Sequence, residues 1–331
     1  MQKFRVLLLL AITVFFTVCY YAMNTQYDPL ARYPYATDSN REEILASISK
    51  QDIQLIIDED IKPEQFLPFA KCDEFTMKNT IAYYHISLIS EEKNATIVSF
   101  TNQAVKSYSL PELLIYLESY SFSNIIDWIN YKDEYSDDSV LLAHPTALDA
   151  VLDEISTVGR YEPNNLEQVT ALSTLISQDD IYLESQTNKS LNDLCEALQS
   201  EFEEKCGGLI GVQGFIRYDK QRSLYDEYLL SYGPDMISRY FNFPGHNESQ
   251  LGSTITVLVA RSSEVSFYGT RQYKWLVNNA YKYGFVIRYR QGKEDITKKR
   301  AQSNQLRYVG KELAKYMYDN NLALEETKVD K

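Results

Sequence analysis

The stretch KWLVNNAYKYGFVIRYRQGKEDIT (residues 274–297), followed by LRYVGKELAKYMYDNNLALEE (residues 306–326), decides the fold class of this chain. In residues 272–283, apolar side chains recur at spacings of three and four residues, which predicts a helix. Residues 285–289 are a short β-branched and aromatic run that is typical of a strand, and residues 310–320 predict a closing helix. Helix and strand therefore lie close together at this end of the chain.

The preceding residues extend the same mixture. Residues 190–207 predict a helix that starts at a capping box of Ser190 and Asp193. Residues 209–215 and 253–260 read as strands, and residues 220–232 read as a helix. Because these elements alternate without a regular βαβ rhythm, the sequence predicts an α+β domain.

The four cysteines, at 19, 72, 195 and 206, form no CxxC pair and no spacing typical of a disulfide framework. Cys195 and Cys206 are eleven residues apart on the predicted helix. At about 1.5 Å of rise per residue they would lie about 16 Å apart, too far for a disulfide. We therefore expect both to be core residues with free thiols.

The chain begins with Lys3 and Arg5 and continues with the uncharged apolar residues 6–23. That length can cross a hydrocarbon core of about 30 Å. No small-x-small cleavage pattern follows, so we expect an uncleaved signal anchor in the cytoplasmic membrane, a single pass with the rest of the chain outside the cell.

Residues 24–160 are acidic and read as a mainly helical region. Residues 41–61 and 110–131 carry the helical period, and residues 85–100 predict a small hairpin around a polar turn. The whole chain has a formal charge of −13, which argues against nucleic acid as a partner.

Beyond these patterns, the two quoted stretches resemble the C-terminal half of VanY-type D-alanyl-D-alanine carboxypeptidases, zinc enzymes that trim peptidoglycan stem peptides. The YEPNNL segment at 161–166, the Gly214-Phe215 pair and the Pro244-Gly245-His246 turn match further family motifs in order. The resemblance implies a domain at 161–331, a central antiparallel sheet with flanking helices, behind the anchor (1–23) and the acidic region (24–160).

The same resemblance assigns the chemical positions of the family. Its zinc ligands lie in S-x-H-x-x-G-x-A-x-D and E-x-x-H, where the Glu is the general base. Here Ser249 and Thr256 stand at the first two ligand positions, Gln305 at the third and Gln302 at the base, while Gly252 keeps the register. All four are neutral, so we expect a degenerate site with no zinc and no other cofactor.

A count of histidines leads to the same expectation, because His246 is the only one after residue 145. A displaced metal site from His246 and Glu248, with Asp235 or Glu264, stays as an alternative. The family's carboxylate-binding arginine position is Ile216, with Arg217 one residue on. The candidate binding cleft comprises Arg217, Tyr218, Gln221, His246, Glu248, Ser249, Thr256, Gln302, Gln305 and Arg307.

The sequence thus predicts a membrane-anchored pseudoenzyme of the bacterial cell wall, which binds stem peptides or a protein of the wall machinery. One alternative is an active D,D- or L,D-carboxypeptidase with a displaced metal. Another is a structural adaptor that acts through residues 24–160.

Overall fold

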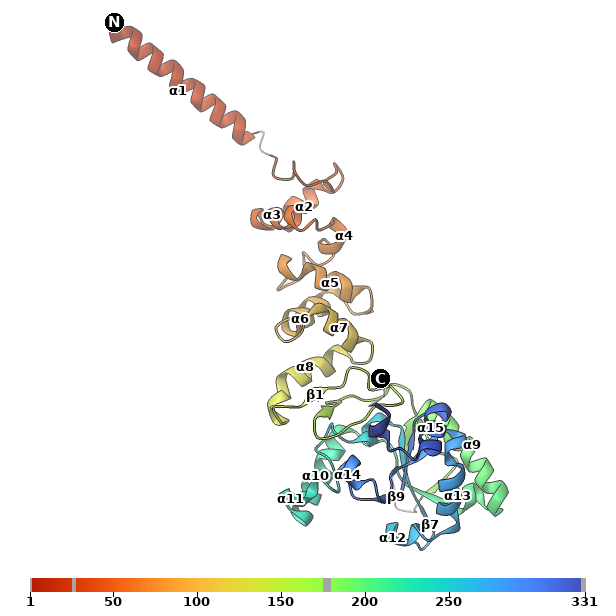
Figure 1. The fold of residues 1–331 in the computed structure, drawn as a ribbon. Helices are drawn as coiled ribbons and strands as arrows, with labels where there is room; N and C mark the ends of the chain where they lie inside the picture. The colour runs from red at the N-terminus through yellow and green to blue at the C-terminus, as the bar shows by residue number, and fades with distance from the viewer. Residues whose placement is uncertain (1, 26–27, 175–179, 329–331) are drawn as a thin grey trace. The chain divides into compact units, whose positions relative to one another are not determined.

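The computed structural model describes residues 2–25, 28–174 and 180–328 (Figure 1). They fall into two compact units, Met1–Leu110 and Pro111–Lys331, which are described separately. The division at residue 110 separates two compact units, whereas the predicted boundary at residue 160 marks the start of the family domain. The boundary at residue 160 therefore stays a prediction.

The first unit begins with helix α1 (Gln2–Thr25). Within it, Arg5–Met23 is apolar and long enough to cross a membrane, and none of that window is buried. The hydroxyls of Thr13 and Thr17 donate to the carbonyls of Leu9 and Thr13, at 2.9 and 2.8 Å. The two threonine hydroxyls of the apolar stretch are therefore satisfied inside the helix, as a hydrocarbon environment requires.

Short helices make up the rest of the first unit. Ser49 caps α3 through a hydrogen bond from the backbone of Asp52, and Ile44, Ile53 and Ile56 are buried in a small core. The predicted helical character of residues 41–61 is confirmed. The elements are α2 (Arg41–Ser47), α3 (Lys50–Asp58), α4 (Pro63–Phe66), η1 (Met77–Asn79), α5 (Thr80–Ser87) and α6 (Asn94–Ala104).

The predicted hairpin at 85–100 is wrong, because α5 and α6 occupy that segment. On α6, Ile97, Phe100, Thr101 and Ala104 are all buried. Their spacing of three and four places them on one helical face. Burial of that face outweighs the β preference of the branched residues.

The second unit contains helices around a central sheet. Its helices are α7 (Leu110–Leu117), α8 (Phe122–Tyr131), η2 (Lys132–Glu134), α9 (Ser185–Phe202), η3 (Lys205–Gly208), α10 (Tyr218–Tyr232), α11 (Pro234–Ile237), η4 (Glu248–Leu251), α12 (Glu264–Phe267), α13 (Arg271–Asn279), η5 (Ala280–Tyr283), α14 (Glu294–Thr297), α15 (Lys311–Asn320) and η6 (Leu324–Lys328). Its strands are β1 (Val140–Leu141), β2 (Ser156–Thr157), β3 (Leu166–Gln168), β4 (Ser173–Thr174), β5 (Tyr182–Glu184), β6 (Leu209–Gln213), β7 (Thr254–Val259), β8 (Phe285–Tyr289) and β9 (Gln302–Tyr308).

The central sheet has the order β4-β6-β7-β9-β8 within the described residues. The short β4 runs parallel to β6, and the other neighbours are antiparallel. Two small sheets, β1 with β2 and β3 with β5, lie outside it. The predicted mixed fold with a central antiparallel sheet is confirmed.

One face of this sheet forms the main core. Figure 1 shows α9 and α13 on one side of β7 and β9, and α10 and α11 on the other. The core side chains alternate along the strands, so the residues between them point to the opposite face. The core residues from these elements include Leu191, Leu194, Leu198, Ile255, Val257, Phe267, Leu276, Phe285, Ile287, Leu306 and Tyr308.

The prediction that the two cysteines of this core are free thiols is wrong. Cys195 and Cys206 form a disulfide, with their Cα atoms 4.0 Å apart. The predicted continuous helix ends at Phe202, where Glu203 adopts a left-handed conformation (φ 60°), and Cys206 is also left-handed (φ 46°). The chain therefore turns back on the helix instead of extending it.

The start of α9 differs from the prediction as well. The helix begins at Ser185, and the carboxylate of Glu184 accepts hydrogen bonds from the backbones of Gln186 and Thr187. Ser190 is buried inside the helix and caps nothing. Glu184, six residues before Ser190, caps the helix in place of the predicted capping box.

Candidate functional site

The sheet face opposite the core carries two of the four replaced positions. Thr256 on β7 lies directly across from Gln305 on β9, and across from Gln213 on β6. Directly opposed residues of antiparallel strands project to the same face. The three side chains therefore form a neutral row, which we call the polar row.

Ser249 approaches the sheet from the 3-10 helix η4, just before β7. It is fully buried, its hydroxyl donates to Asn247 Oδ1 at 2.8 Å, and its carbonyl accepts from the backbone of Ile216 at 3.3 Å. The Ser249 hydroxyl is thus used in a local turn, and the Ser249 backbone is hydrogen-bonded to Ile216.

The two glutamines lie on β9, Gln302 at its first residue and Gln305 at its middle. Gln305 is 9% exposed, and its Oε1 has no hydrogen-bond partner. Gln302 is partly exposed and pairs in register with Tyr289 of β8 rather than with Thr256. The strand register thus joins Thr256 to Gln305, whereas the described contacts join neither Ser249 nor Gln302 to that pair.

This donor set does not fit a catalytic zinc ion. Zinc in proteins takes imidazole, thiolate or carboxylate ligands, and the assigned positions offer two hydroxyls and an amide. Across the described residues, no group of three or more His, Cys, Asp or Glu side chains is close enough to hold a metal. No catalytic step through a metal follows from these residues.

The residues suggested for a displaced metal are engaged elsewhere. Both oxygens of Glu248 accept from Arg288 at 2.8 Å, and both oxygens of Glu264 accept from Arg300 at 3.0 and 2.9 Å. A carboxylate whose two oxygens hold a guanidinium is a poor metal ligand. Neither Glu248 nor Glu264 is therefore available as a ligand for the displaced metal site considered above.

Glu248 and Arg288 form a buried ion pair that fastens η4 to β8. Their side chains are 2% and 1% exposed. Burial favours the neutral acid, but the Arg288 and Arg307 guanidinium groups outweigh it and lower the pKa of Glu248. Glu325 adds a second carboxylate on Arg288, at 2.7 Å. This network holds the segment that carries Ser249 in place.

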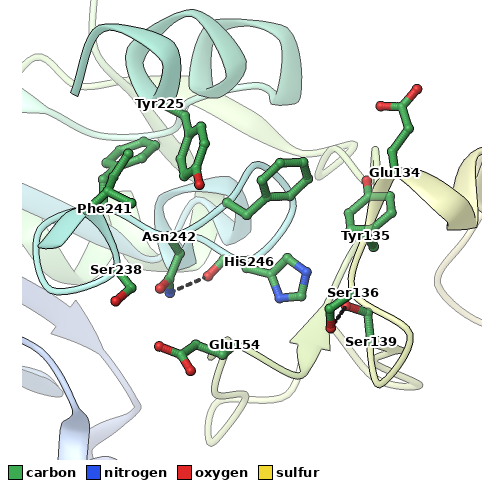
Figure 2. A pocket seen from close by; sticks show the side chains of 12 residues that line it. Glu134, Tyr135, Ser136, Ser139, Glu154, Tyr225, Ser238, Phe241, Asn242 and His246 are labelled. Atoms are coloured by element: carbon green, nitrogen blue, oxygen red, sulfur yellow. Dashed lines mark hydrogen bonds between the residues drawn. The ribbon is translucent and has the colours of Figure 1, made fainter. Parts of the chain in front are cut away.

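A separate cavity of about 240 Å³ surrounds His246. Figure 2 shows the His246 ring facing this cavity together with Tyr135 and Tyr225, while Glu154 approaches from below. His246 is 3% exposed, and its Nδ1 lies 2.7 Å from the carbonyl oxygen of Asp153; because this oxygen can only accept a hydrogen bond, Nδ1 is the donor. Burial lowers the pKa of His246, so the ring is neutral at pH 7.

Three further residues of the predicted cleft act in different places. Arg217 is exposed and lies 3.8 Å from Glu162. Tyr218 is buried under the Arg160 guanidinium, 4.3 Å from the ring centre. Gln221 donates to the carbonyl of Ile216 at 2.8 Å, so its side chain stabilises the fold rather than facing a ligand. The structure does not gather the predicted cleft residues around one point.

Segment 140–160, upstream of the predicted domain, also reaches the site. Ala150 accepts a hydrogen bond from Arg307 at 3.2 Å, and Thr157 donates to the carbonyl of Gly245 at 2.9 Å. Glu154 of this segment lines the His246 cavity, together with Tyr135, which lies just before the segment. Sequence reasoning missed these residues because they lie far from their partners along the chain.

Comparisons with known proteins identify the family of this domain. The family model of VanY, D-alanyl-D-alanine carboxypeptidase, matches residues 180–311. A solved LD-carboxypeptidase, LdcB, is 30% identical, with a TM-score of 0.53; the match covers 58% of this chain and 90% of that one. The chain belongs to the VanY carboxypeptidase family.

Curated relatives of this VanY-family chain are bacterial. A protein of Bacillus subtilis (strain 168) named putative carboxypeptidase YodJ is 35% identical over 175 residues, 51% of this chain and 62% of its own length. A D-alanyl-D-alanine carboxypeptidase of Enterococcus faecalis is 29% identical, over 45% of this chain and 60% of its own length. The chain thus spans about three fifths of the length of these two curated relatives.

Proposed function

We propose that this chain is a membrane-anchored protein of the bacterial cell wall whose VanY-like domain binds peptidoglycan stem peptides without hydrolysing them. The observation that carries the proposal is the polar row. Thr256 and Gln305 face each other at two positions where the family has metal ligands. Neutral hydroxyl and amide groups cannot lower the pKa of a water molecule as a metal ion does.

The replaced positions retain the means to bind a peptide. The Oε1 of Gln305 is buried without a partner and can accept a hydrogen bond from a peptide N–H. An unsatisfied buried amide oxygen costs about 1–3 kcal/mol, which a bound donor would recover. Loss of charge at all four positions also avoids leaving an uncompensated carboxylate where no metal binds.

Two features support a location outside the cytoplasm. Helix α1 has the length and apolarity of a membrane anchor, with residues 6–23 in the bilayer. The Cys195–Cys206 disulfide is typical of proteins that fold in an oxidising compartment. The acidic region 24–160 and the VanY-like domain would then both lie outside the cytoplasm.

The test uses the full-length protein in detergent. Binding to purified peptidoglycan sacculi and release of D-alanine from a soluble pentapeptide are measured on the same preparation. The proposal expects binding without release. Release of D-alanine at a rate above that of a heat-treated sample would instead establish the alternative of an active carboxypeptidase.

A matched pair of substitutions locates the binding site. Gln305→Leu removes the free oxygen and is expected to weaken binding to sacculi about tenfold, the value of one lost hydrogen bond. Gln199→Leu makes the same change at an exposed position of α9 and is expected to change nothing. Equal binding by both variants would favour an adaptor that binds through residues 24–160, or a wall protein as the partner.

A restoration experiment tests whether the four replaced positions correspond to the zinc site of the family. Zinc affinity is expected to appear in a variant that carries the family residues at all four positions, if the backbone geometry is retained. A correctly folded variant that binds no zinc would mean that the polar row is not the former metal site. The variant combines Ser249→His, Thr256→Asp, Gln302→Glu and Gln305→His.

A further inference from the structure

A second cavity, of about 280 Å³, lies at the end of β9 beside the start of α9. We call it the Arg307 pocket. Neither the four replaced positions nor His246 is among the residues that line it. It is therefore a different cavity from that of Figure 2, and no residue of the polar row lines it, although Arg307 and Gln305 lie two residues apart on β9.

Arg307 lines this pocket with most of its hydrogen-bonding capacity unused. The side chain is 1% exposed, and only its Nη2 donates to the protein, to Ala150 at 3.2 Å. Its Nε and Nη1 have no hydrogen-bond partner, and neither does the buried hydroxyl of Ser253 in the same lining. Buried donors in native proteins almost always have partners, so several unpaired donors around one cavity indicate a missing acceptor.

Among the described residues, no acid accepts a hydrogen bond from Arg307 Nε or Nη1, although the charges of Glu248 and Asp149 act on the guanidinium. Glu248 uses both oxygens on Arg288 and stays 4.0 Å from Arg307 Nη1, beyond hydrogen-bond distance. Glu184 lines the pocket, but its carboxylate accepts from the backbones of Gln186 and Thr187 at 3.1 and 2.9 Å. It is thereby tied to the start of α9.

The lining also restricts the kind of acceptor. Arg307 is its only basic residue and Glu184 its only acidic one, so the pocket suits a single negative charge better than a dianion such as phosphate. Ala147, Leu148 and Leu251 add apolar surface beside the donors. The volume has room for a carboxylate with a few carbon atoms attached.

We propose that the Arg307 pocket binds a small organic carboxylate, with the Arg307 guanidinium and the Ser253 hydroxyl as donors and the apolar lining around its carbon atoms. A free short-chain acid and the C-terminal residue of a peptide present this same chemistry. Arginine is well suited to the role because its guanidinium donates to a carboxylate with charge assistance.

The test measures binding to the full-length protein by isothermal titration calorimetry. The probes are propionate, for the free acid, and N-acetylalanine, for a peptide C-terminus, each compared with its neutral amide. Binding of either acid without binding of its amide supports the proposal, and the tighter acid identifies the source. Absence of binding by both acids, or equal binding of acid and amide, would overturn it.

Two variants assign the binding to this pocket. Ser253→Ala removes one donor to a charged group and is expected to weaken binding roughly tenfold or more. Ser200→Ala, at an exposed site on α9, is the control that should change nothing. Leu148→Trp enlarges a half-exposed side chain of the lining and should block the pocket with little effect on folding. Unchanged binding in both Ser253→Ala and Leu148→Trp would place the acid elsewhere and refute the assignment.

Discussion

The Glu248→Gln substitution tests the packing that supports the site. The amide keeps the size of the side chain but removes the charge that Arg288 holds through two hydrogen bonds of 2.8 Å. Arg288 and Arg307 are both 1% exposed and would lose their shared buried counter-ion. Breaking a fully buried ion pair from one side costs about 3–5 kcal/mol. We expect the free energy of unfolding of the second unit to fall by that amount.

Urea unfolding followed by tryptophan fluorescence measures this loss. Trp128 and Trp275 are the two tryptophans of the chain, and both lie in the second unit. Glu325→Gln is the control: it alters the same Arg288 network at a side chain that is 23% exposed, and is expected to cost only about 1 kcal/mol. A loss below about 1 kcal/mol for Glu248→Gln would refute the reasoning that this pair holds η4 on the sheet.

Three further changes test other parts of the account. Because burial lowers the pKa of His246 below its ordinary 6.5, the unfolded state takes up the proton first, and stability falls as the pH drops below about 6.5. His246→Gln should remove that loss of stability in thermal melts between pH 7 and 5. An unchanged pH profile in the variant would contradict this prediction. Replacing Cys195 and Cys206 together with serine should lower the free energy of unfolding by roughly 2–4 kcal/mol, and an equal melting temperature with and without reductant would argue against the bond. Gly252→Ala should lower the free energy of unfolding by roughly 1–3 kcal/mol, because the φ of residue 252 is +69° and the added Cβ would lie 3.0 Å from the backbone nitrogen of Glu184. An unchanged free energy of unfolding would show that this turn relaxes freely.

The sequence predicted the elements that have strong local patterns. Phe285–Tyr289 is a strand with the predicted bounds, and α10, β7 and α15 lie within two residues of their predicted ends. Each of these segments combines a clear period with a glycine or a polar turn at its border. Local pattern was sufficient there because the tertiary packing agrees with it.

The missed features depend on contacts between distant residues or on single backbone angles. The disulfide requires left-handed conformations at Glu203 and Cys206, which neither residue type favours. The contact of Arg307 with Ala150 joins residues 157 positions apart. Nothing local marks such a contact, so segment 140–160 could not be assigned to the site from its own sequence.

The candidate site was predicted in part. The family motifs identified Thr256 and Gln305 as partners, and the strand register pairs them. The same motifs could not reveal that Glu248 is held by Arg288, because that pairing joins η4 to β8 through side chains alone. The use of these positions in peptide binding stays a proposal.

Zinc analysis of the purified full-length protein tests the central claim most directly. The protein is incubated with zinc, passed through a desalting column, and its metal content is measured by mass spectrometry beside an active carboxypeptidase of the VanY family. The account predicts no retained zinc in this chain and about one ion per molecule in the enzyme. One tightly retained zinc per chain, lost when Thr256 and Gln305 are both changed to alanine, would contradict it.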